Sequence, residues 1–269
     1  MPGLSVADGT PRDCSSNGCG SQADTSIIRD RELGTSRASA LGRTEGNGPV
    51  DASVMIANFM DGAGAPTNKG PESSSGVEDD LSGLPGATQN KRGLIGDFLS
   101  SIKGGGGKGT KSEQAVEKSV AASAGQGATS GLPTCSDDGS ITMTFRQINQ
   151  DGAGPLKADV DATSGGTDPE AFETAEVTQD VPGLAIGGLS LATNTDFPVT
   201  VQMPAGMTCE ATVGGVDNVC IVRVRNRAIA GPFGGSAAFT QSPAARKRAI
   251  AYRLKKRAEE GQYHNRRLR

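Results

Sequence analysis

Alternating apolar and polar residues are concentrated in the second half of the chain. The stretches 140–148, 199–203 and 221–225 carry apolar side chains at or near every second position, a period typical of half-buried β-strands. Clusters of Gly, Pro, Asp and Ser separate them, at 151–155, 164–169, 187–188, 204–206 and 214–215. Several short strands divided by turns predict a mainly β fold, an antiparallel β-sandwich.

Helical periodicity is confined to shorter segments. We expect a helix after Pro49, because proline is favoured in the first helical turn and Val50, Val54 and Ala57 then recur on one side. A second apolar helical face is expected near 92–102. A basic helix is expected at 242–260, with Ser242 as its N-cap.

Composition divides the chain into four parts. Residues 62–131 are rich in Gly, Ser and acidic residues and poor in large apolar ones, so few groups there can bury surface in return for ordering the chain. We interpret them as a low-complexity, disordered insertion that contains the short helix near 92–102. The parts are then an N-terminal portion of the domain at 1–61, the insertion at 62–131, the β-sandwich core at 132–241 and a basic helical tail at 242–269.

Charge is unevenly distributed. Residues 246–269 contain ten Lys or Arg and two Glu, a net charge of +8, which leaves −11 for residues 1–245 in a chain whose net charge is −3. This tail favours an anionic partner, a polymer or a lipid surface, and the alternative is a solvated tail that offsets the acidic body. We expect no specific nucleic-acid partner.

The sequence has no membrane or export signal that we recognise. No apolar run approaches the ~20 residues that span a bilayer, so we expect no transmembrane segment. Residues 1–8 lack the basic start and apolar run of a signal peptide.

The five cysteines allow more than one disulfide arrangement. Cys14 and Cys19 are close in sequence, and Cys209 and Cys220 bracket a predicted hairpin. Two local disulfides with Cys135 left over fit this spacing, but an odd count allows other pairings. Buried free thiols in a cytosolic protein are the alternative.

No set of residues predicts catalysis. The one histidine, His264, lies in the basic tail, away from any nucleophile it would serve. The glycines Gly104, Gly106 and Gly109 match a dinucleotide-binding spacing, but neither the required strand nor the required helix flanks them. We therefore expect no enzyme activity, no catalytic or metal-binding residues and no cofactor.

A candidate binding surface is the loop 149–155 together with polar residues elsewhere in the chain. Its candidate residues are Arg43, Asn47, Asn149, Asp151, Arg223 and Asn226. The alternative is that these side chains hold turns and cap strands.

Several unbroken stretches resemble a known family. They are 22–32 (QADTSIIRDRE), 41–50 (LGRTEGNGPV), 146–155 (RQINQDGAGP), 197–209 (FPVTVQMPAGMTC), 218–226 (NVCIVRVRN) and 231–235 (GPFGG). Together they resemble the fungal appressorium-associated virulence factors, the Egh sixteen-like or MAS/Gas-type proteins. The resemblance implies a secreted protein of host penetration with no established catalytic activity. Our own hypothesis is that the protein acts by binding cell-wall polysaccharide or the host surface.

The resemblance also leaves alternatives. The family is similar in form to copper-dependent polysaccharide monooxygenases, so the sandwich is expected to be immunoglobulin-like or monooxygenase-like. Copper chemistry of that kind needs two histidines, whereas this chain begins with Met1 and carries Arg146 where relatives carry His; arginine cannot ligate copper. The alternatives are a degenerate monooxygenase-like protein and a cytosolic interaction protein of appressoria. We also expect that a signal peptide and first strand precede Met1 in the complete gene.

Overall fold

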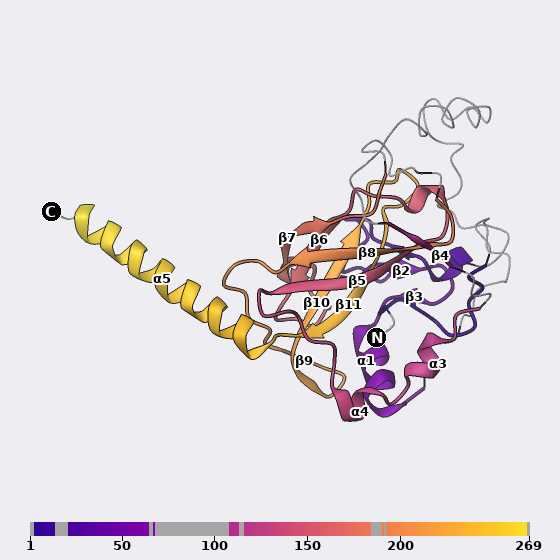
Figure 1. The fold of residues 1–269 in the computed structure, drawn as a ribbon, viewed down its shortest axis with the longest axis horizontal. Helices are drawn as coiled ribbons and strands as arrows, with labels where there is room; N and C mark the ends of the chain where they lie inside the picture. The colour runs from indigo at the N-terminus through magenta and orange to yellow at the C-terminus, as the bar shows by residue number, and fades with distance from the viewer. Residues whose placement is uncertain are drawn as a thin grey trace.

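The protein consists of a β-rich body from which one long helix projects (Figure 1). The structure is a computed structural model that describes residues 3–13, 21–64, 67, 108–112, 116–183, 190 and 192–267, with side chains as far as residue 261. The predicted helix near 92–102 and the predicted Cys14–Cys19 pair lie outside the described residues.

The described strands form an antiparallel network of eleven members. They are β1 (Ser26–Ile27), β2 (Arg43–Thr44), β3 (Gly48–Pro49), β4 (Thr110–Lys111), β5 (Ser140–Gln147), β6 (Lys157–Asp161), β7 (Phe172–Gln179), β8 (Thr195–Gln202), β9 (Ala211–Val213), β10 (Val216–Arg225) and β11 (Phe233–Thr240). The order is β3-β2-β1-β11-β10-β6-β7-β8-β4, with β5 also paired to β8 and β9 to β10. The mainly β, antiparallel prediction is confirmed.

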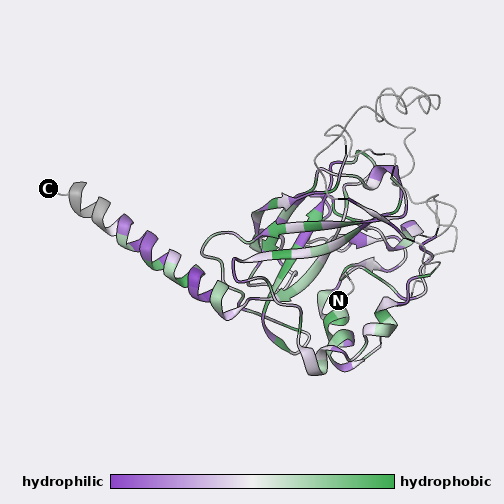
Figure 2. Ribbon diagram, viewed as in Figure 1, coloured by the Kyte–Doolittle hydropathy of each residue, from purple (hydrophilic) through white to green (hydrophobic). Residues whose placement is uncertain are grey.

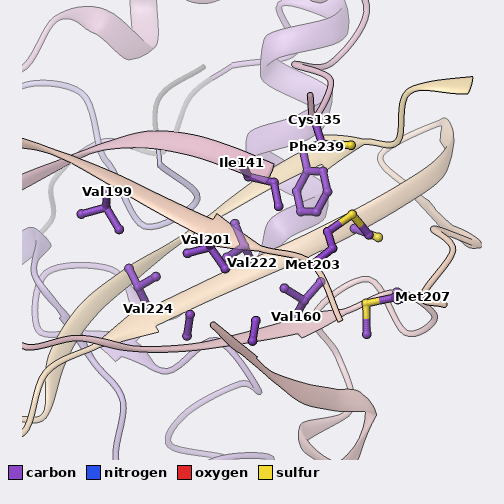
Figure 3. Close-up of a cluster of buried hydrophobic side chains, with 14 of the residues drawn as sticks. Cys135, Ile141, Val160, Val199, Val201, Met203, Met207, Val222, Val224 and Phe239 are labelled. Atoms are coloured by element: carbon purple, nitrogen blue, oxygen red, sulfur yellow. The ribbon is translucent and has the colours of Figure 1, made fainter. Parts of the chain in front are cut away.

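The main core lies between the layer of β11, β10 and β6 and the layer of β8 and β5. Alternate residues of each strand point into it, as the strand period requires, and Figure 3 shows Val222 and Val224 of β10 opposite Val199 and Val201 of β8. Phe239 of β11 closes the cluster and is almost completely buried. Sheet-on-sheet packing of this kind is the architecture that the alternating sequence predicted.

A second core covers the opposite face of β10 and β11. Val219 and Ile221, which alternate with the residues of the main core, pack with Leu41 and Ile56 from the N-terminal part of the chain. β10 therefore has both faces buried, which explains why residues 219–222 form an unbroken apolar run.

The remaining described elements are three short α-helices, the long C-terminal helix and short 3-10 turns. The α-helices are α1 (Ala52–Asp61), α3 (Ser119–Ser123), α4 (Gly127–Ser130) and α5 (Pro243–Arg267), and the 3-10 turns are η2 (Ser21–Asp24), η4 (Gln150–Gly152) and η5 (Pro169–Ala171).

Helix α1 confirms the helix expected after Pro49, but two details of the prediction were wrong. Pro49 belongs to β3, and the helix begins later because the Asp51 carboxylate caps it by accepting from the Ser53 N–H. The buried face carries Ile56 and Phe59, whereas Val54 is 43% exposed. This face is buried because Ile56 and Phe59 belong to the second core, whereas Val54 lies on the side of the helix that faces solvent.

The C-terminal helix is confirmed as basic and capped. The Ala245 N–H donates to the Ser242 hydroxyl at 3.1 Å, as the sequence predicted. Ala245 and Ala249 are buried against the body, and from residue 250 the described side chains are exposed. No helix in the described part of the chain is long and apolar enough to cross a membrane.

One disulfide joins the hairpin of β9 and β10 to the segment before it. Cys209 and Cys220 are bonded, with their Cα atoms 5.0 Å apart, and both are buried. Cys135 is a buried free thiol, and burial raises its pKa. The pairing of Cys209 with Cys220 is therefore the one that the spacing favoured.

Candidate functional site

A groove runs between the two strands at the ends of the main layers, β5 and β11. Its volume is about 620 Å³, and residues 141–146 of β5 and 233–239 of β11 line it. Val199 and Val224 also line it, and the inward-facing Met143 and Phe145 of β5 are only partly buried. The main core is thus open to this groove along the edge of β5.

The N-terminal segment forms part of the opposite wall. Gly3, Ser5 and Val6 line the groove, and the Leu4 N–H donates to the Ser236 carbonyl of β11 at 2.8 Å. The Ser236 hydroxyl is buried and has no hydrogen-bond partner among the described residues. The wall therefore presents an unsatisfied polar group beside apolar lining residues.

Charged side chains gather at one end of the groove. Arg12 Nη2 lies 2.5 Å from Asp24 Oδ2, and Arg12 Nε lies 3.4 Å from Glu117 Oε2. The Asp24 carboxylate, which also accepts from the Ala7 N–H at 3.0 Å, is fully buried. Burial raises the pKa of Asp24 to about 7, although the charge of Arg12 opposes the shift.

Glu117 and Arg146 extend this charged end. The pKa of Glu117 lies below its usual range. Burial acts to raise it, but hydrogen bonds from Ser119 and the charges of Arg12 and Arg146 outweigh that effect. Arg146 forms a two-pronged contact with Asp196, at 2.8 and 3.1 Å. Two guanidinium groups thus face three carboxylates, so this end has no large net charge.

The six predicted binding residues do not form one surface. Of the six, Asn149 alone lines the groove, and it caps the turn η4 by accepting from the Asp151 N–H at 3.2 Å. Asn226 joins this loop by donating to the carbonyls of Asp151 and Ala153 at 2.6 and 3.1 Å. Burial raises the pKa of Asp151.

Two of the remaining candidates, Arg43 and Arg223, belong to buried networks elsewhere. Arg43 lies 3.1 Å from Glu32 and also pairs with Glu45. Arg223 donates to the carbonyl of Ala40, pairs with Asp159 at 3.0 Å and lies 4.1 Å over the ring of Phe172. The side chain of Asn47 has no hydrogen-bond partner among the described residues.

We predict that Asn226→Ala lowers the free energy of unfolding by about 2 kcal/mol. The Asn226 carboxamide satisfies four backbone groups, because its oxygen also accepts from the N–H groups of Ala228 and Phe233, both at 3.0 Å. Urea unfolding of the two proteins measures the loss. Asn47→Ala is the matched control and should change stability little; equal losses in the two variants would contradict a structural role for Asn226.

The described residues contain no cluster of side chains suited to binding a metal ion. Among them, no group of three or more His, Cys, Asp or Glu side chains is placed to hold a metal ion. The guanidinium of Arg146 pairs with Asp196. Because arginine stays protonated, it has no nitrogen lone pair to donate to a metal ion.

A second candidate surface is helix α5. Beyond its first two turns, the described helix is mostly hydrophilic and extends away from the body (Figure 2). The Lys and Arg residues whose side chains the structure describes are Arg246, Lys247, Arg248, Arg253, Lys255, Lys256 and Arg257, against Glu259 and Glu260. Two exposed apolar side chains, Ile250 and Leu254, lie one turn apart. The helix therefore offers a basic surface with a small apolar stripe.

Comparison with known proteins agrees with the stretches of sequence described above. The model of the Egh16-like virulence factors matches residues 1–234. The chain belongs to this family. It is 56% identical to the appressoria-specific virulence factor GAS2 of Pyricularia oryzae over 257 residues, which cover 96% of this chain and 84% of that protein.

A second relative of the Egh16-like family is more distant. The appressoria-specific virulence factor GAS1 of Pyricularia oryzae is 36% identical over 169 residues, which cover 61% of this chain and 63% of that protein. No solved structure gives a significant match.

Sequence reasoning missed the groove and its charged end. Arg12, Asp24 and Glu117 come from segments far apart in sequence, and Glu117 lies within the region interpreted as low-complexity. The sequence offers one signal for burial of these charges. Arg12 and Asp24 lie close to apolar residues, at 4–7 and 27–28 respectively.

Proposed function

We propose that this Egh16-like protein is a secreted, non-catalytic virulence-associated protein that acts during appressorium-mediated host penetration. Its relatives GAS1 and GAS2 are named appressoria-specific virulence factors, which supports the biological setting. In this proposal the protein works by adhesion to a polyanionic component of the fungal wall or host surface.

The observation that carries the adhesive role is the exposed basic helix α5. Its first turns are fixed to the body: Arg246 donates to the Cys209 carbonyl and Arg248 to the Asp137 carbonyl, each at 3.0 Å. Arg253, Lys256 and Arg257 lie farther along, are exposed, and have no ion-pair partner in the described part of the molecule. A rigid support that holds free cations in solvent favours electrostatic adhesion.

We predict that neutralising the outer part of α5 weakens this adhesion at least tenfold at low salt. The variant combines Arg253→Gln, Lys255→Gln, Lys256→Gln and Arg257→Gln. A cation near an anionic surface contributes roughly 1 kcal/mol, and salt screens that contribution. Binding to polygalacturonate beads and to phosphatidylserine vesicles, measured over a range of NaCl concentrations, tests the effect and shows which anion is preferred.

A matched control preserves the charge of the helix. Arg253→Lys, Lys255→Arg, Lys256→Arg and Arg257→Lys together should bind like the wild type. The proposed adhesive role of α5 is wrong if removal of residues 246–269 leaves salt-sensitive binding unchanged, or if wild-type protein binds neither probe.

A further inference from the structure

The outer part of helix α5 carries apolar side chains that stay exposed to solvent. Ile250 is 40% exposed and Leu254 is 60% exposed, and they lie one turn apart on the same side of the helix. Ala258 follows one turn later and is exposed as well. The surrounding helix is mostly hydrophilic (Figure 2). Electrostatic adhesion needs the cations of α5 but gives no reason for this apolar stripe.

The apolar stripe faces away from the body of the protein. Ala245 and Ala249, which are buried, lie on the side of α5 that packs against the body. At 3.6 residues per turn, Leu254 lies roughly 140–180° around the helix from these two alanines. The helix also extends away from the body along its length (Figure 1). A broad, flat partner can therefore contact the stripe without meeting the body.

Two arginines flank the apolar stripe. Arg253 and Arg257 each follow a residue of the stripe by three positions, so they lie beside it, roughly 60° around the helix. Both are exposed. The acidic residues Glu259 and Glu260 lie roughly 120–140° around the helix from Leu254. The side of α5 that bears the stripe therefore combines apolar side chains with positive charge.

This combination distinguishes between the polyanions that α5 could bind. A hydrated acidic polysaccharide pairs with cations but offers no apolar interior to Ile250 and Leu254. An anionic membrane offers both, because its charged headgroups lie directly over apolar acyl chains. Amphipathic helices bind such surfaces with the apolar side buried at the headgroup boundary and the basic residues toward the headgroups. Arginine suits the flank of such a stripe, since its long stem lies along apolar surface while the guanidinium reaches polar groups.

We propose that α5 binds an anionic phospholipid membrane and lies in the plane of its surface. Ile250 and Leu254 insert between the headgroups, and Arg253 and Arg257 pair with the lipid phosphates. The exposed stretch 250–261 provides a contact about 18 Å long. This inference rests on the proposed adhesive role of α5 and names the partner of that helix.

A tryptophan reporter tests insertion in the full chain. The chain contains no tryptophan, so a single introduced one reports its own surroundings. Leu254→Trp places it on the stripe, and Tyr252→Trp, roughly 160° around the helix, is the matched control. With vesicles of phosphatidylserine and phosphatidylcholine in equal parts, the emission of Leu254→Trp should shift to shorter wavelength and be quenched by lipids brominated on their acyl chains. A shift that is absent in Leu254→Trp, or no larger there than in Tyr252→Trp, would overturn the proposal.

A second variant removes the stripe but keeps the charge of the helix. Ile250→Gln combined with Leu254→Gln changes two exposed positions and introduces a residue that favours helix. Binding to the same vesicles should weaken roughly tenfold, whereas binding to polygalacturonate beads should stay as in the wild type. Unchanged vesicle binding would contradict insertion of the stripe. Equal losses on both probes would also contradict it, because the stripe would then not be specific for lipid.

The choice of membrane and the adhesive role of α5 fail in different ways. If the wild type binds polygalacturonate in a salt-sensitive manner but does not bind the vesicles, the membrane is the wrong partner and the adhesive role remains. If it binds neither probe, both proposals are wrong. Vesicles of phosphatidylcholine alone should bind roughly tenfold more weakly than the mixed vesicles, and equal binding would contradict the requirement for anionic lipid.

Discussion

Replacement of both Cys209 and Cys220 by alanine is expected to lower the free energy of unfolding by about 3 kcal/mol. The two cysteines are 11 residues apart, and closing a loop of this size removes that much entropy from the unfolded chain in the chain-entropy model. For a protein of this length, the loss corresponds to a decrease of roughly 6–12 °C in Tm. Calorimetry and guanidinium unfolding measure both quantities.

Reducing agent provides the control for this prediction. Dithiothreitol should bring the wild type close to the double variant and should leave the double variant unchanged. If the double variant also loses stability in reducing agent, then Cys14 or Cys19 contributes as well. Cys135→Ala, which removes a buried free thiol, should leave the response to reducing agent as in the wild type.

The Cys209–Cys220 disulfide also tests whether the protein resides in an oxidising compartment. Structural disulfides persist in oxidising compartments and are rare in the cytosol. Cys209 and Cys220 should therefore be oxidised in protein recovered from the fungus, as the proposed secretion requires. Free thiols at both positions would favour the cytosolic alternative.

Arg12→Met is expected to destabilise the protein by about 3–5 kcal/mol at pH 8. The substitution keeps an unbranched side chain but leaves the fully buried Asp24 carboxylate without its cation, and an unpaired buried charge is costly. The loss should be smaller at pH 5, because Asp24 then binds a proton. Unfolding in urea at the two pH values measures the difference, and an equal loss at both would contradict this account.

The companion variant Asp24→Asn isolates the titration of Asp24. Its pKa is raised from 3.8 to about 7 in the folded protein, so between these values the folded state binds more protons than the unfolded state. The contribution of Asp24 to wild-type stability therefore falls as pH rises from about 4 to about 7. Relative to the wild type, Asp24→Asn should gain stability over this window, by up to ~1.4 kcal/mol per pH unit. A difference that does not vary with pH would show that Asp24 does not titrate there.

Strand positions could be predicted from the sequence because their signal is local. The apolar residues of 140–148 and 199–203 alternate, and the structure has β5 and β8 there. The basic helix at 242–260 was equally clear, since Ser242 caps it, Pro243 stands at its first position, where proline is tolerated, and no proline occurs after that. In each case a few neighbouring residues determine the conformation.

The N-terminal part could not be predicted in this way. Its charged residues make it look like a solvated, turn-rich segment, yet Arg12 and Arg43 are buried because Asp24 and Glu32 pair with them. Pairing over such sequence distances leaves no periodic signal. The burial of Ile27 and Ile28 likewise depends on strand β11, about 200 residues later.

The candidate binding residues show the same limit. Polar residues such as Asn149 and Asn226 were selected by type, but the backbone groups that their side chains contact follow from the folded structure: Asn149 accepts from the Asp151 N–H, and Asn226 donates to the Asp151 carbonyl. The groove was missed because it arises where β5 and β11, which are about 90 residues apart in sequence, face each other in the folded protein. Strand order is not encoded in the spacing of any one segment.

Because β10 covers apolar residues of the N-terminal part, those residues can be buried only after β10 has been synthesised. The apolar side chains of the N-terminal part, among them Leu41 and Ile56, are sheltered by Val219 and Ile221, which leave the ribosome much later. Until then, these side chains have no cover from the strand that finally hides them, so the nascent chain is a client for chaperones over most of its translation. Recombinant fragments that end before β10, at residue 215 or earlier, lack Val219 and Ile221, would leave the same surface bare and should be insoluble.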